Sequence, residues 1–153
     1  MRNIRTELDI DAPIEEVWSV LSDIESWESW NPVVPKIQAR KQLGGGVRFE
    51  IHVPPGKPLK LAAKFLAWEE NREMAWGGGI PGVFSGNHYF RLEPRDAGGC
   101  RIIHGEDFRG LVPLLLFTRK RVANIEAAYS RMNEALAAET KRRLAAASAT
   151  PAS

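Results

Sequence analysis

The chain has 153 residues, of which 44% are hydrophobic and 26% are charged, so it is long enough for one domain with a real core and has a globular composition, not a disordered one. Its 21 basic and 19 acidic residues leave a formal net charge of +2, which is too even a balance to indicate nucleic-acid binding. The N-terminus has no apolar signal region, and the longest apolar run (111–117) is far shorter than the ~20 residues of a membrane span, which predicts a cytoplasmic protein without integral membrane contact.

The first 31 residues predict a strand followed by two short helices. Residues 2–11 alternate apolar and charged side chains, the pattern of a half-buried strand. Pro13 suits the first turn of a helix, and the apolar positions 14, 17, 18 and 21 then fall on one helical face. Asp23 starts a second short helix, which ends at Asn31 because a residue before proline is driven out of the helical region.

The middle of the chain predicts six further strands joined by turns and loops. The strands are expected over residues 36–42, 47–53, 59–69, 73–77, 83–93 and 100–109, with turns or loops at the glycine and proline clusters between them. Because the successive connections are tight, the sheet is expected to be antiparallel.

The last segment predicts a long amphipathic helix over residues 119–147. Its apolar positions are spaced three and four residues apart, at Val122, Ile125, Tyr129, Met132 and Leu136. Such a helix would be ~40 Å long and would cross a whole small domain. Several alanines on the helix are expected to leave space above the sheet, and residues 148–153 are expected to form a disordered tail.

Three stretches carry a resemblance to a known family. They are IDAPIEEVWSVLSDIESWESWNPVVP at 10–35, FSGNHYFRLEP at 84–94 and HGEDFRG at 104–110. With the order of elements over residues 3–147, they resemble the START-like (SRPBCC) superfamily, most closely its polyketide cyclase/dehydrase-like branch. The resemblance implies an α+β helix-grip fold, in which a curved antiparallel sheet of about seven strands surrounds a long C-terminal helix. Residues 1–147 would then form a single domain, with the helix pair closing one end of a cavity for an apolar small molecule.

The strand alternation places three polar side chains, His88, His104 and Glu106, on the inward face of the last two strands. If the turn pairs Leu92 with Ile102, His88 lies opposite Glu106, at ~5 Å between Cβ atoms, which predicts a direct hydrogen bond between the imidazole and the carboxylate. The pair is either a polar spot for a ligand, able to move a proton, or a structural buried pair, and a catalytic role needs a third oriented group that the sequence does not reveal. The ligand-binding residues expected in the cavity, which would open near residues 77–82, are Phe49, Trp76, Phe84, His88, Phe90, His104, Glu106 and Phe108.

Three functions remain open from the sequence. The first is binding of a small hydrophobic ligand such as a lipid, a quinone, an isoprenoid or a polyketide. The second is an aromatase/cyclase-type enzyme in which His or Glu moves protons, and the third is a protein-interaction module, which an exposed apolar patch would favour. No cofactor is expected. The histidine and glutamate spacings match no metal-ligand motif, and the single Cys100 excludes a disulfide and a cysteine-based metal site. The sequence leaves open whether the chain is a monomer or a dimer.

Overall fold

The computed structural model describes residues 2–149, which form seven strands and several helices. Their bounds along the chain are β1 (Arg2–Ile10), α1 (Ile14–Ser22), the 3-10 turn η1 (Ile24–Ser26), α2 (Trp27–Trp30), β2 (Lys36–Ala39), β3 (Gly46–Ile51), β4 (Leu59–Glu69), β5 (Glu73–Ile80), β6 (Phe84–Pro94), the 3-10 turn η2 (Asp96–Gly98), β7 (Cys100–Arg109), α3 (Leu111–Leu116) and α4 (Arg119–Ala149).

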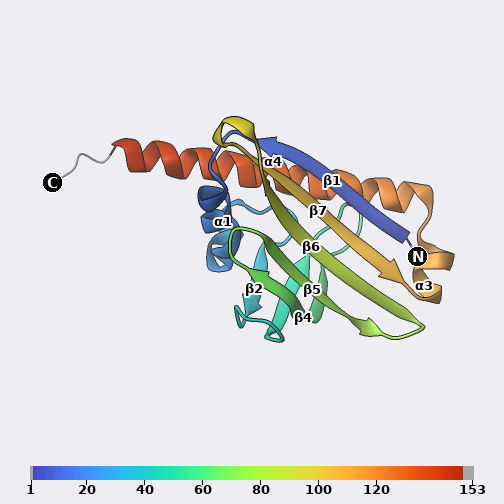
Figure 1. Ribbon diagram of the computed structural model, residues 1–153. Helices are drawn as coiled ribbons and strands as arrows, with labels where there is room; N and C mark the ends of the chain where they lie inside the picture. The colour runs from blue at the N-terminus through green and yellow to red at the C-terminus, as the bar shows by residue number, and fades with distance from the viewer. Residues whose placement is uncertain (1, 150–153) are drawn as a thin grey trace.

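The strands make one antiparallel sheet in the order β1-β7-β6-β5-β4-β3-β2, and α4 runs across one face of it (Figure 1). This confirms the expected α+β helix-grip architecture. The register between β6 and β7 is also as expected, with Leu92 opposite Ile102 and His88 opposite Glu106. Helix α4 continues through Ala149, so Ser148 is helical and not part of a tail. The rest of the predicted tail, residues 150–153, lies outside the described residues.

Two parts of the fold differ from the sequence-based expectation. Strand β5 runs three residues further than predicted, through Ile80, because its glycines are used for close backbone approach and not for a turn. A Cβ at Gly78 would lie only 2.8 Å from the Ala62 carbonyl oxygen of the neighbouring strand. The apolar run after β7 forms the short helix α3, which was not predicted, and Gly110 leads into it with φ +105°, a value that favours glycine.

The inward face of α4 is the one predicted, although it is buried less completely near the start of the helix. Tyr129, Met132 and Leu136 are buried against the sheet, and Val122 and Ile125 are half-buried against the cluster of Ile4, Phe108 and Tyr129. Ala123, Ala127 and Ala138 are exposed, whereas Ala128 is buried in the core on the sheet side of the helix. Among the described residues of α4, no alanine lines the cavity between the helix and the sheet, so these alanines do not make the expected space.

The end of the molecule that holds α1, η1 and α2 is packed solid. Trp27 is fully buried and meets Phe90 edge-on, with ring centroids 6.0 Å apart. Its indole Nε1–H donates to the Leu21 carbonyl at 3.0 Å, so the one polar atom of the ring has a partner. The aromatic cluster continues to Trp76 and Trp30 around the same ring. We call this the closed end.

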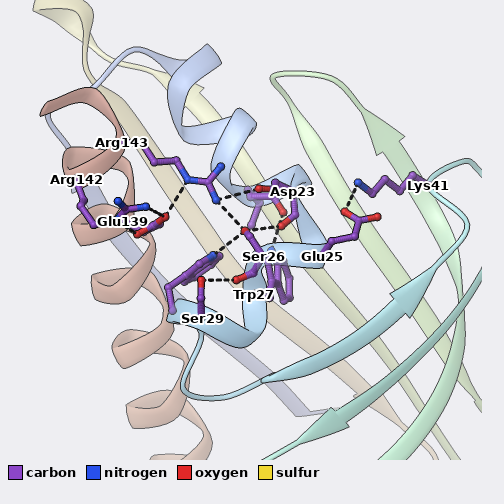
Figure 2. A network of polar contacts seen from close by, with 11 residues as sticks. Asp23, Glu25, Ser26, Trp27, Ser29, Lys41, Glu139, Arg142 and Arg143 are labelled. Carbon is purple, nitrogen blue, oxygen red and sulfur yellow. Dashed lines mark hydrogen bonds and ion pairs between the residues drawn. The ribbon is translucent and has the colours of Figure 1, made fainter. Parts of the chain in front are cut away.

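Charged side chains also tie α4 to the closed end (Figure 2). Glu139, which is 8% exposed, accepts hydrogen bonds from Arg142 at 2.7 Å and from Arg143 at 2.9 Å. Arg143 Nη2 donates to Asp23 at 2.9 Å and to Ser26 at 2.8 Å, in the connection between α1 and α2. The hydrogen bond from Arg142, aided by Arg143, lowers the pKa of Glu139 to about 2.

Candidate ligand-binding cavity

A cavity of about 850 Å³ lies between the sheet and the N-terminal part of α4. This is within the usual range for small-molecule sites, roughly 300–1,000 Å³. Among the residues expected to bind a ligand, six line it: Phe49, Trp76, Phe84, His88, Glu106 and Phe108. The other two, Phe90 and His104, are fully buried and lie behind the cavity wall, where they pack on the residues that form it.

The cavity is open to solvent along one side, which we call the mouth. Some lining residues are themselves exposed, and they mark this opening on four segments: the loop 54–57, the first half of β4 at 59, 61 and 62, the end of β5 at 78–80, and residues 118, 120 and 121 around the start of α4. The opening therefore includes the region of residues 77–82. Three cations, Lys57, Lys120 and Arg121, stand at the mouth, whereas most of the cavity wall is apolar.

The inner wall of the cavity holds one polar cluster, which comes from three elements. His88 on β6 and Glu106 on β7 face Tyr129 on α4. The Tyr129 hydroxyl donates a hydrogen bond to Glu106 Oε2 and lies 3.2 Å from His88 Nδ1. Direct contact between His88 Nδ1 and Glu106 Oε2 is longer, at 3.8 Å. Tyr129 therefore bridges the histidine and the carboxylate, instead of the direct hydrogen bond that the sequence suggested.

Behind His88, the hydrogen bonds continue away from the cavity. His88 Nε2 lies 3.1 Å from His104 Nε2, and His104 Nδ1 lies 2.8 Å from Asn133 Oδ1. The Asn133 amide then donates to Thr6 Oγ1 at 3.0 Å. Because the single Thr6 hydroxyl proton is donated to the His104 carbonyl, Thr6 can only accept from Asn133. Asn133 must therefore present its oxygen to His104, whose Nδ1 carries a proton.

Two pKa shifts assign the remaining protons. Complete burial, together with the neighbouring His88, holds the pKa of His104 well below its usual value, so His104 is neutral and its Nε2 accepts a hydrogen bond. Burial, together with Glu106, raises the pKa of Tyr129 well above its usual value, so the phenol keeps its proton.

His88 joins the two parts of this network. Because His104 Nε2 accepts, the proton between the two histidines belongs to His88 Nε2. On its other side, His88 Nδ1 is linked to Glu106 Oε2 through the Tyr129 hydroxyl. Trp76 stacks on the His88 ring with centroids 4.5 Å apart.

Glycine makes room for the carboxylate of this cluster. A Cβ at Gly86 would lie 2.5 Å from Glu106 Oε1. Since both residues line the cavity, Glu106 leans over the bare backbone of β6 with one oxygen on Tyr129 and the other on the glycine side.

Sequence reasoning missed two members of the network, Tyr129 and Asn133. Tyr129 was predicted to be buried, which is confirmed, but only as an apolar packing residue. Asn133 lies four residues further along the same helix face and is 1% exposed. The sequence did contain a signal for Asn133: it is a polar residue one helical turn after Tyr129 and beside the inward-facing Met132, which predicts a side chain directed toward the sheet.

Other candidate chemistry receives no support from the geometry. Cys100 is buried, and burial raises the pKa of its thiol to about 11, which keeps it protonated and poorly nucleophilic. Within residues 2–149, no group of three or more His, Cys, Asp or Glu side chains is arranged to hold a metal ion.

Comparison with known proteins places this geometry in context. The model of a family described as "Polyketide cyclase / dehydrase and lipid transport" matches residues 1–141. Among curated proteins, none matches the sequence.

Solved structures share the fold at low sequence identity. The Zhui aromatase/cyclase of Streptomyces sp. R1128 is 21% identical, with a TM-score of 0.70, over 94% of this chain and 95% of that one. A START superfamily protein of Mycobacterium smegmatis is 14% identical, with a TM-score of 0.73, over 92% of this chain and 97% of that one. A hypothetical protein of Helicobacter pylori is 17% identical, with a TM-score of 0.74, over 91% and 88%. At these identities the likeness concerns the fold alone.

Proposed function

The chain belongs to the polyketide cyclase / dehydrase and lipid transport family, and from this premise we propose that its cavity binds a small apolar molecule that carries one polar group. The ligand classes that suit it are a lipid, a quinone, an isoprenoid or an aromatic polyketide. The apolar body would contact Phe49, Trp76 and Phe84, while its carbonyl or hydroxyl would meet the His88–Tyr129–Glu106 cluster.

One observation carries this proposal: a largely apolar cavity of about 850 Å³ ends in a single polar cluster. A cavity lined only by apolar groups would bind an apolar ligand without fixing its orientation. A few placed polar groups in an apolar site give a ligand its orientation and its specificity. Glu106 is the member with an oxygen left toward the cavity, so it is the group expected to meet the ligand.

The first experiment identifies the ligand. Native mass spectrometry of freshly purified protein should show a population heavier than the chain by the mass of one apolar molecule, and organic extraction should recover it. Absence of a bound species, together with no binding of a hydroxyanthraquinone or of a fluorescent fatty acid in titrations, would contradict the proposal.

The second experiment tests the cluster. Glu106→Gln keeps the shape of the side chain and removes its charge, so a hydroxyanthraquinone should bind about tenfold more weakly or worse, as expected for loss of a hydrogen bond to a charged group. Glu134→Gln, at an exposed site on α4, is the matched control and should leave affinity unchanged. If Glu106→Gln lowers only the melting temperature and leaves affinity unchanged, the cluster is a structural pair.

A second candidate function is a cyclase-type enzyme, which the hydrogen-bonded chain from His88 through Tyr129 to Glu106 favours. Transfer of a proton from His88 Nδ1 to the Tyr129 oxygen, with transfer of the Tyr129 proton to Glu106, would turn an imidazolium and a carboxylate into a neutral imidazole and a neutral carboxylic acid without changing the net charge. Glu106 would then donate to a ligand carbonyl, and the reverse movement would take a proton back, which is the general acid–base work of an aldol-type ring closure.

Two measurements test this candidate. Nitrogen-15 spectra of the His88 ring should show protons on both nitrogens, and a spectrum with one unprotonated nitrogen would remove its support. Reconstitution with a polyketide synthase that supplies a linear poly-β-ketone should give more of one cyclised product with the wild type than with Tyr129→Phe. An identical product distribution would leave ligand binding as the function.

A further inference from the structure

We propose that the mouth end of this protein docks on the surface of an anionic lipid bilayer, with α3 lying in the interfacial region. This goes beyond ligand binding in the cavity, and its test does not require the cavity ligand to be known. Within residues 2–149, no helix is long and apolar enough to cross a bilayer, so the proposed contact is peripheral.

The first observation is an apolar patch on the surface. Leu114 and Leu115 of α3 are 59% and 75% exposed, although large apolar side chains normally gather in the core. Six of the ten exposed large apolar residues described lie on α3 and on the adjacent turn between β5 and β6. We call these six the apolar patch: Ile80, Val83, Leu111, Leu114, Leu115 and Leu116.

The patch is one continuous surface, because α3 is held against the turn. The backbone N–H of Leu111 donates to the Gly82 carbonyl at 3.2 Å, and that of Val112 donates to the Val83 carbonyl at 3.0 Å. Figure 1 shows α3 at the end of the sheet opposite α1, beside the start of β1. Contiguous exposed apolar surfaces of this kind mark sites of interaction.

The second observation is the charge around the patch. The segments that carry the patch and the mouth, residues 51–64, 77–86 and 108–125, contain no Asp or Glu, although the chain has 19 acidic residues. Exposed basic side chains do occur there, namely Lys57, Lys60, Lys64, Arg109, Arg119, Lys120 and Arg121, and Arg2 of β1 lies beside the end of β7. Leucines flanked by cations and free of carboxylates suit an anionic lipid surface, because leucine enters the acyl boundary and lysine or arginine meets the headgroups.

The third observation is the position of the cavity. Ile80 belongs to the patch and also lines the cavity, and Lys120 and Arg121 stand at the mouth. A bilayer contacting the patch would therefore also cover the opening through which an apolar molecule enters. A protein partner or a nucleic acid would also meet the cations, but nucleic acid offers no apolar counterpart for the leucines.

The experiment is flotation of the purified full chain with two kinds of vesicle, phosphatidylcholine alone and phosphatidylcholine with phosphatidylserine. The chain should float with the anionic vesicles and much less with the neutral ones, and added salt should weaken the binding. The double variant Leu114→Ser with Leu115→Ser should bind about tenfold more weakly or worse, since two leucines no longer enter the bilayer. Its matched control, Leu43→Ser with Leu66→Ser, changes two residues of similar exposure outside the patch and should bind as the wild type does.

The cations are tested in the same way. Arg119→Gln with Lys120→Gln should weaken binding to anionic vesicles by about fivefold for each charge removed. The control, Arg131→Gln with Lys141→Gln, removes two exposed charges further along α4 and should have little effect.

Four results would overturn the proposal. They are no flotation with either vesicle, equal loss of binding in the patch variants and their controls, a wild-type dimer that Leu114→Ser with Leu115→Ser converts to a monomer, and tight binding of an oligonucleotide that the leucine changes leave unaffected. The third result would identify a second copy of the chain as the occupant, and the fourth would identify nucleic acid.

Discussion

The two ends of this molecule use the same two layers, the sheet and α4, yet one end is solid and the other is hollow. At the closed end, α1, η1 and α2 add a third layer, and Trp27 fills the space between sheet and helix. At the mouth end no such layer is present within the described residues, and a cavity of about 850 Å³ remains. The cavity therefore exists because α1, η1 and α2 fill the space between sheet and helix at one end only, and not because α4 carries small side chains.

The largest expected difference between the ends concerns aromatic truncation. Trp27→Ala should lower the free energy of unfolding by about 3–5 kcal/mol, because it opens a void in a packed region. Phe84→Ala, at a ring that already borders the cavity, should cost about 1 kcal/mol or less. Urea denaturation measures both values. Equal losses would mean that the mouth end is packed as tightly as the closed end.

The next effect concerns the bridging hydroxyl. Tyr129→Phe keeps the ring stacked on His104 but leaves His88 and Glu106 without their shared partner. The free energy of unfolding should fall by about 1–3 kcal/mol. Tyr89→Phe, a change to a buried ring on the other face of the sheet, is the control and should cost less. A Tyr129→Phe variant as stable as the wild type would show that the hydroxyl bridge contributes nothing to the fold.

A smaller effect, with a defined pH range, belongs to the closed end. The pKa of Glu139 is about 2 in the folded protein against an ordinary value of 4.5, so its stabilisation is complete above about 4.5 and is lost as the pH falls toward 2. Glu139→Gln should cost about 1–2 kcal/mol at neutral pH, because the 66% exposure of Arg142 screens part of the interaction.

Melting temperatures measured from pH 7 to pH 2 provide the check. The gap between the wild type and Glu139→Gln should be constant above 4.5 and should close at the acid end. The exposed Glu134→Gln serves as the control. A gap that persists at pH 2 would mean that the carboxylate charge is not the source of the stabilisation.

The smallest effect on stability is expected from Gly86→Ala at the cavity wall. The new methyl group would displace Glu106, but alanine also restricts the unfolded chain more than glycine does, so the free energy of unfolding should change by less than about 1 kcal/mol. Binding of a hydroxyanthraquinone should nevertheless weaken several-fold. Gly46→Ala, where the added atom meets nothing within 4 Å, is the control for both measurements.

Much of the fold could be predicted from the sequence because alternation and turn length constrain a strand pair strongly. The β6–β7 register followed from a short turn and two alternating strands, and it placed His88 opposite Glu106. The boundaries of β4 and β7 were also predicted as they occur. The predictions that were wrong or missing concern segments whose local sequence is compatible with more than one structure. A glycine run signals a turn, yet it also suits close strands, and an apolar run containing Pro113 matched neither strand nor helix.

The candidate site was predictable only where it lies on strands. The hydroxyl bridge requires that α4 cross β6 and β7 at Tyr129, and the crossing point of a helix on a sheet depends on tertiary packing that periodicity does not encode. For the same reason Asn133, which orients His104, could not be assigned a partner from the sequence alone.

The attachment of α3 has a consequence for how such a protein can evolve. The two bonds that hold α3 to the β5–β6 turn join backbone groups, so they do not depend on which side chains the helix displays. Mutation could exchange the leucines for polar or acidic residues while the helix kept its place. Since the cluster proposed to meet the ligand lies on β6, β7 and α4, the outer surface could come to bind a different partner without any change in the residues of that cluster.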